Sequence, residues 1–88
     1  MPVPDAAVVE RDVTKFIVDN FLFGNVAEAP APRTSFMETG LIDSTGVLEL
    51  VAFVEEKYGV KVGDDELVPE NLDSVANLAA FVVRKTGG

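Results

Sequence analysis

The segment between Asp43 and Gly59 constrains the fold more than any other part of the chain, because all of its helical signals agree. Aspartate is a preferred residue for capping a helix N-terminus, and glycine often follows the last helical turn. Between them, apolar residues recur at the spacing of one face of an α-helix: Val47, Leu50, Val51, Val54 and Tyr58. We therefore predict a helix over residues 44–58 with one side packed on a core.

Two further segments show the same periodicity. One runs from an N-cap at Asp5 to residue 23, where Gly24 ends it, and the other runs from a cap at Asp73 or Ser74 to Lys85. Residues 64–68 can form a single helical turn, which Pro69 closes. The prediction is an all-α protein, a small four-helix bundle of three main helices and one short helix. Residues 5–85 form its single domain, between tails at residues 1–4 and 86–88.

The connection over residues 25–43 is long for a small domain and contains Pro30 and Pro32, which disfavour a helix. Phe36-Met37 and Leu41-Ile42 are predicted to anchor it on the core. Such a loop fits either a segment that presents a functional side chain or a plain crossover between two helices.

Charge and composition exclude several functions. The chain has 15 acidic and 7 basic residues, a formal charge of −8. This charge disfavours nucleic acids and anionic membranes as partners and favours a basic protein. The alternative is that the charge only keeps the protein in solution. The absence of Cys and His excludes thiol nucleophiles, imidazole bases and Cys/His zinc sites. The acids of residues 64–66 lack the spacing of a calcium-binding EF-hand. No apolar run approaches the roughly 20 residues of a membrane-spanning helix, and no signal peptide is recognisable, so we expect a cytoplasmic protein without membrane insertion.

The candidate functional residue is Ser44, at the start of the predicted central helix. Stepping about 100° per residue places it opposite the apolar stripe, where its hydroxyl faces solvent. Asp43-Ser44 can equally be an ordinary capping pair, since both residue types favour helix N-termini.

The run GLIDSTGVLELVAFVEEKYGVKV, residues 40–62, resembles the central region of acyl carrier proteins. The resemblance implies a 4′-phosphopantetheine arm on Ser44, which a phosphopantetheinyl transferase adds from coenzyme A. It also implies that Asp43 helps to bring the metal ion of the transferase and the serine together; alternatively, Asp43 is only a helix cap. The thiol of the arm would hold acyl or aminoacyl groups as thioesters. The chain would then be a monomeric carrier and not an enzyme. A ligase would load the acyl or aminoacyl group, and synthases or transferases would use the loaded carrier as a substrate.

The sequence departs from the family after the serine, where a larger apolar residue is usual and Thr45-Gly46 stands instead. Ser-Thr-Gly is more similar to small carriers loaded by adenylating ligases than to the carrier of fatty acid biosynthesis. Fatty acid, polyketide, aminoacyl and peptide pathways all stay open.

The side of the predicted helix that carries Ser44 is a candidate docking surface for basic partners, or else a plain solvated face. Its members are Thr45, Leu48, Glu49, Ala52, Glu55 and Glu56. Leu48 can instead lie at the edge of the core. The competing function is an acidic helical adaptor that binds a basic protein and is never modified.

Overall fold

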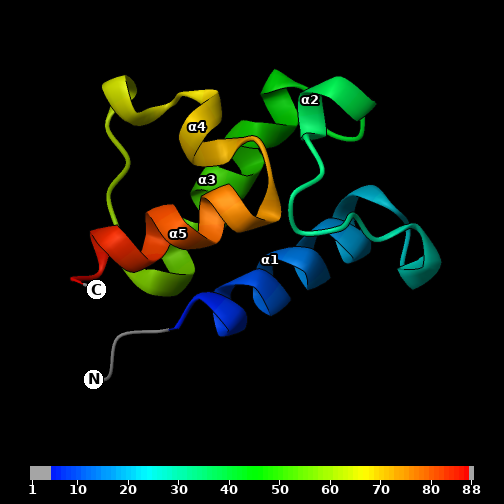
Figure 1. The fold of residues 1–88 in the computed structure, drawn as a ribbon, viewed down its shortest axis with the longest axis horizontal. Helices are drawn as coiled ribbons and strands as arrows, with labels where there is room; N and C mark the ends of the chain where they lie inside the picture. The colour runs from blue at the N-terminus through cyan, green and yellow to red at the C-terminus, as the bar shows by residue number, and fades with distance from the viewer. Residues whose placement is uncertain (1–4, 88) are drawn as a thin grey trace.

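A computed structural model describes residues 5–87 (Figure 1). The elements are α1 (Ala6–Phe21), η1 (Val26–Glu28), α2 (Phe36–Thr39), α3 (Ser44–Tyr58), η2 (Asp64–Glu66), α4 (Pro69–Leu72) and α5 (Val75–Lys85), where η1 and η2 are 3₁₀ turns. Within these described residues the secondary structure is entirely helical. The prediction of an all-α bundle with three main helices is thus confirmed.

The three long helices begin at capping residues that the sequence indicated. Asp5 caps α1 by accepting a hydrogen bond from the Val8 N–H (2.8 Å), and Asp43 caps α3. At α5 the capping residue is Ser74, whose hydroxyl accepts from the Asn77 N–H (3.0 Å). Each cap satisfies one of the N–H groups that a helix leaves unpaired at its start.

The helix ends agree less evenly with the prediction. α3 ends at Tyr58 as predicted, because Gly59 adopts a left-handed conformation (φ 69°). α1 ends at Phe21, two residues before the predicted end, because Phe23 as well as Gly24 has a positive φ (54° and 81°). A helix cannot continue through that conformation.

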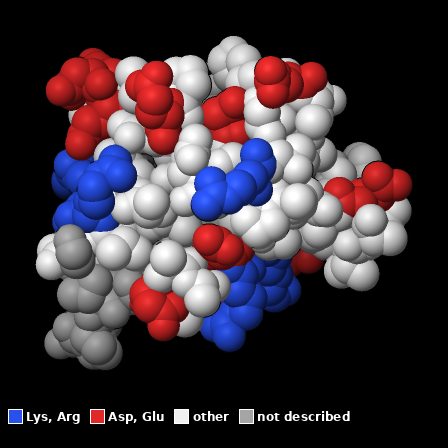
Figure 2. Space-filling view, in the orientation of Figure 1, with Lys and Arg blue, Asp and Glu red and all other residues white. Residues whose placement is uncertain are grey.

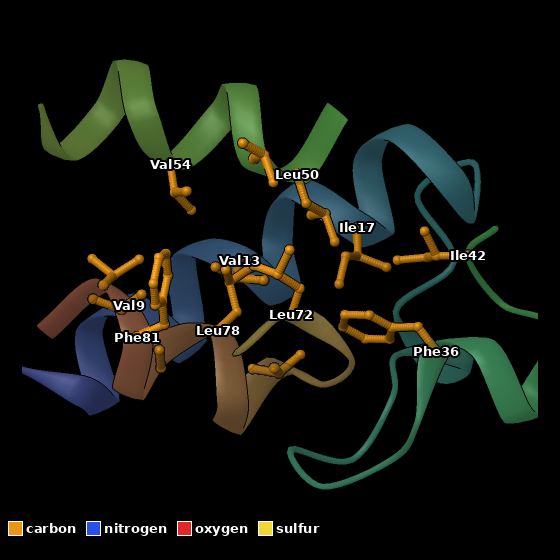
Figure 3. Close-up of a cluster of buried hydrophobic side chains, with 14 of the residues drawn as sticks. Val9, Val13, Ile17, Phe36, Ile42, Leu50, Val54, Leu72, Leu78 and Phe81 are labelled. Carbon is orange, nitrogen blue, oxygen red and sulfur yellow. The ribbon is translucent and has the colours of Figure 1, made fainter. Parts of the chain in front are cut away.

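The core lies where α1, α3 and α5 face one another (Figure 3). Its fully enclosed side chains, each no more than 2% exposed, are Val9, Val13, Ile17, Phe36, Ile42, Leu50, Val54, Val75, Leu78, Ala79, Phe81 and Val82. Phe36 and Ile42 come from the long connection before α3, so side chains of this connection form part of the core.

The long connection also contains what the sequence did not reveal. Residues 36–39 form the short helix α2, and Met37 is 52% exposed, so the expectation that Met37 anchors the loop is wrong. Pro69 begins α4 instead of closing the preceding turn, which suits a residue that has no N–H to leave unpaired. The turn predicted at residues 64–68 is present as η2, and the bundle has two further short α-helices, α2 and α4, that were not predicted.

At the ends of the chain, residues 1–4 and 88 lie outside the described part. The predicted tails fall largely there. Thr86, also placed in a tail, is the C-cap of α5, and its hydroxyl donates to the Val82 carbonyl (3.0 Å).

Candidate functional site

The chain has three serines, and their surroundings differ sharply. Ser74, which also follows an aspartate, is 4% exposed and uses its hydroxyl to cap α5. The hydroxyl of Ser35 donates to the Asp73 carboxylate and accepts from the Glu38 N–H. Ser44 is exposed, and among residues 5–87 no hydrogen bond involves its hydroxyl. Of the three hydroxyls, only that of Ser44 is free to react with a molecule from solution.

Ser44 is the first residue of α3, and the residue before it, Asp43, caps the helix. The Gly46 N–H donates to Asp43 Oδ1 (2.8 Å), and the Val47 N–H donates to the Asp43 carbonyl (2.9 Å). The N–H groups of Ser44 and Thr45 have no partner among the described residues. The start of α3 thus presents an open hydroxyl beside two unpaired donors at the positive end of the helix dipole.

The segment leading to Ser44 is held by residues far away in the sequence. Asp73, between α4 and α5, accepts from the N–H of Phe36 through its carbonyl (2.8 Å) and from the N–H of Met37 through Oδ1 (3.0 Å). The Phe36 carbonyl in turn accepts from the Ile42 N–H (3.4 Å), and both side chains are buried. Two residues after Ile42 the chain reaches Ser44, so the position of the serine depends on the α4–α5 junction.

A shallow apolar hollow opens directly beside Ser44. It has a volume of about 260 Å³ and lies between α2, α3 and the η2–α4 segment, lined by Met37, Ser44, Val47, Leu48, Leu67, Val68, Pro69, Leu72 and Asp73. Met37, Leu48 and Leu67 are 52%, 56% and 37% exposed, which is unusual for large apolar side chains. Contiguous exposed apolar surface is typical of places where proteins bind partners or ligands.

Of these rim residues, only Leu48 was a candidate from the sequence. Met37 was expected in the core, and Leu67 lies more than twenty residues from Ser44 in the chain. The only signal available was an apolar residue next to a run of acids, which does not specify a neighbour in space.

The structure divides the predicted docking residues of α3 between two sides of the helix. Leu48 lines the hollow beside Ser44, whereas Glu49, Ala52 and Glu56 line a separate hollow against α1. Glu55 is partly buried, and its Oε2 accepts a hydrogen bond from the Val62 N–H (2.9 Å), which holds the chain after α3. Thr45 is exposed. Ser44 and the glutamates Glu49 and Glu56 therefore belong to adjacent surfaces and not to one.

Acidic residues also gather on the elements next to the hollow: Asp73 lines it, and Asp64, Asp65, Glu66 and Glu70 belong to η2 and α4. Figure 2 shows them along the upper edge of the molecule, over the region labelled α4 and α2 in Figure 1. Among them, Glu66 accepts from the Gly63 N–H and pairs with Lys85 (3.0 Å), and these contacts lower the pKa of its carboxyl group below the ordinary 4.5. The negative field around the hollow favours a partner with basic side chains.

Two other kinds of site are absent from residues 5–87. No group of acidic side chains there is arranged to hold a metal ion, and no helix is long and apolar enough to cross a membrane.

The start of α3 has the chemistry that a 4′-phosphopantetheine group requires. The open Ser44 hydroxyl can form a phosphodiester, and the unpaired N–H groups of Ser44 and Thr45 favour negative charge there. The hollow beside the serine offers apolar surface to the pantetheine chain.

Comparison with known proteins points to the same group. Residues 22–82 match the family described as "Phosphopantetheine attachment site". An acyl carrier protein of Nitratidesulfovibrio vulgaris strain DP4 is 36% identical over 74 residues, 78% of this chain and 95% of the relative. That of strain DSM 19637 / Miyazaki F is 31% identical over 77 residues, 88% of this chain and 96% of the relative. A probable acyl carrier protein PigG of Serratia sp. is 27% identical over 77 residues, 88% of this chain and 87% of the relative.

These matches cover most of the chain and most of each relative. The protein therefore belongs to the acyl carrier protein family, whose members are carriers with a covalent 4′-phosphopantetheine arm and not enzymes.

Proposed function

We propose that Ser44 is the residue that bears the arm, and that the protein holds acyl or aminoacyl groups on it as thioesters for partner enzymes. The observation that supports this most is the contrast among the three serines: Ser74 and Ser35 are engaged inside the fold, whereas the Ser44 hydroxyl is exposed. In the attachment step, the Ser44 hydroxyl gives its proton to a base of the transferase, and its oxygen forms a bond to the phosphorus that bears pantetheine. The pyrophosphate bond of coenzyme A breaks, and adenosine 3′,5′-bisphosphate leaves.

The composition of the chain suits a carrier. Because it contains no Cys, the thiol of the arm is the only thiol after modification, so no internal thiol can take the acyl group by exchange. Because it contains no His, the protein has no imidazole to act as a base in thioester hydrolysis. The thioester on the arm is therefore expected to persist until a partner enzyme reacts with it.

The hollow beside Ser44 is the proposed contact surface for the phosphopantetheinyl transferase and the loading enzyme. Its exposed rim of Met37, Leu48 and Leu67 supplies apolar contacts. The surrounding acids, with Asp43 beside the serine, attract basic side chains and speed the encounter. Binding through such a surface is expected to be fast, weak and sensitive to salt.

The arm is further proposed to be loaded by an adenylating ligase. The support is the Ser-Thr-Gly sequence at residues 44–46, where small residues follow the serine and leave Thr45 exposed. Incubating the modified protein with ATP, a carboxylic acid and such a ligase should add the acyl mass only when ATP is present. Loading by an acyltransferase from acyl-coenzyme A without ATP, and none by ligases, would contradict this part of the proposal.

The attachment site is tested by intact mass after co-expression with a broad-specificity phosphopantetheinyl transferase. Wild-type protein should gain the mass of one phosphopantetheine, and Ser44→Ala should gain none. Thr45→Ala is the matched control, since it removes the neighbouring exposed hydroxyl and should still be modified. A mass gain that persists in Ser44→Ala would refute the assignment of the site.

A further inference from the structure

Met37 combines an exposed sulfur atom with a position next to Ser44. The chain contains no Cys and two Met, so Met37 carries the only sulfur among residues 5–87. Its side chain is 52% exposed, although methionine is among the residues most often buried. It lines the hollow beside Ser44 and forms part of the rim. Solvent therefore reaches the one described side chain that can be oxidised at sulfur.

Backbone contacts hold Met37 at the rim. Its N–H donates to Asp73 Oδ1 (3.0 Å), and the Ser35 hydroxyl caps the short helix α2 by accepting from the Glu38 N–H (3.1 Å). The adjacent Phe36 fills the core position and is 0% exposed. A chemical change at the Met37 sulfur can therefore alter the rim while the core and the backbone of α2 stay as they are.

Oxidation of this sulfur would change the character of the hollow. Methionine sulfoxide replaces an apolar thioether by a polar S=O group. Most of the lining is apolar, and the ionised Asp73 carboxylate can only accept hydrogen bonds. Among the lining side chains, the hydrogen-bond donor is the Ser44 hydroxyl. A sulfoxide oxygen at the rim therefore either keeps water in the hollow or engages the hydroxyl that has to react, and both oppose a partner that packs there.

We propose that Met37 is a site of reversible oxidation by peroxides, and that its sulfoxide slows the enzymes that act on Ser44. In the forward step the sulfur lone pair attacks one oxygen of hydrogen peroxide, the O–O bond breaks, and an S=O bond forms. The attacked oxygen passes its proton to the leaving hydroxide, which departs as water, so sulfur loses two electrons and the peroxide gains them. A methionine sulfoxide reductase restores the thioether with two electrons from a dithiol and releases the oxygen as water. The inference rests on the proposed carrier function, because its effect is measured at Ser44.

The first measurement follows oxidation of the folded full-length protein, before any arm is attached. After treatment with hydrogen peroxide, peptide mapping by mass spectrometry should find one added oxygen atom on the peptide that contains Met37. The Tm of the oxidised protein should change by no more than about 4 °C, as for a change at an exposed side chain. The proposal is overturned if Met37 is oxidised only under conditions that unfold the protein, or if its oxidation lowers Tm by more than this.

The second measurement is the rate of phosphopantetheine attachment before and after peroxide treatment, with the peroxide removed before transferase and coenzyme A are added. Oxidised wild-type protein should have a kcat/KM about tenfold lower, the size expected for one polar group buried without a partner. The two methionine sulfoxide reductases, one for each sulfoxide epimer, should restore the rate. Met37→Gln, which places a polar group at the rim without peroxide, should be as slow as the oxidised protein.

Met37→Leu is the matched control, since leucine is apolar, similar in volume and not oxidised by peroxide. This variant still contains Met1, so its rate after peroxide should equal its own rate before peroxide. An equal loss in Met37→Leu, or an unchanged rate in fully oxidised wild-type protein, would overturn the proposal. Failure of the untreated wild-type protein to be modified at Ser44 would instead refute the proposed function. Oxidation of Met37 is measured without the transferase, so the two proposals can fail separately.

Discussion

Gly46 is the residue that lets the start of α3 lie close against the rest of the protein. It is buried, and a Cβ added to it would lie 2.6 Å from Ile42 Cγ2 and 3.0 Å from Phe21 Cε1. Ile42 is only 2% exposed and has little room to move. The change Gly46→Ala therefore sets a helix-forming residue against a close contact.

The two effects have opposite signs and comparable sizes. Replacing glycine by alanine within a helix gains at most about 1 kcal/mol, and less near a helix end. Overpacking a well-filled site costs about 1–3 kcal/mol. Because the shorter contact is with a buried side chain, we expect the cost to dominate, with a net loss of about 1–2 kcal/mol in the free energy of unfolding. For a domain of this size each kcal/mol lowers Tm by about 4–8 °C.

Urea and thermal unfolding followed by circular dichroism measure this loss. Thr45→Ala is the matched control, since it introduces the same residue one position earlier on an exposed side and should change stability by no more than about 0.5 kcal/mol. If Gly46→Ala were more stable than wild type, helix propensity would outweigh the contact, and the argument that Gly46 permits close packing would be refuted.

Four other substitutions test contacts that hold the helices in place, with Ser44→Ala as the control for Ser74→Ala. Ser74→Ala should lower the free energy of unfolding by about 0.5–2 kcal/mol because it removes the cap of α5. Ser44→Ala should be nearly neutral in the same urea titration, and equal losses would contradict the capping assignments. Tyr58→Phe removes the hydrogen bond to Asp12 (2.7 Å) and should cost about 1 kcal/mol near neutral pH. Burial and the Asp12 carboxylate raise the pKa of the Tyr58 hydroxyl above its ordinary 10.0. The stabilisation by this hydrogen bond is therefore complete below pH 10 and is lost as the pH rises through the folded pKa. A difference in unfolding free energy between wild type and Tyr58→Phe that persisted in strong alkali would contradict this prediction. Glu66→Gln should lower the free energy of unfolding at neutral pH, because contacts in the folded state lower the pKa of the Glu66 carboxyl group. The difference from wild type should fade as the pH falls below about 4.5 and Glu66 becomes protonated. Unfolding titrations in which the difference does not change with acid would contradict this prediction.

What the sequence predicted well depends on local signals. The bounds of α3 follow from Asp43 before it and Gly59 after it, both of which act through backbone contacts within a few residues. The core positions of α3 and α5 follow in the same way from helical periodicity.

What it missed depends on contacts between distant segments. The short helix α2 is held by Asp73, far along the chain, and no pattern within residues 36–39 indicates that partner. Exposure of Met37 follows from the same contact, since Phe36 takes the buried position. Likewise, the fact that the two sides of α3 line separate hollows depends on where α1 lies, which periodicity along α3 alone does not define.

The central claim is that the arm is on Ser44, and peptide mapping of the modified wild-type protein tests it most directly. Cleavage after glutamate, at Glu38 and Glu49 among others, places Ser35, Ser44 and Ser74 on three different peptides. Tandem mass spectrometry should find phosphopantetheine on the peptide of residues 39–49 alone. Finding it on the peptide that contains Ser35 or Ser74 would contradict the account.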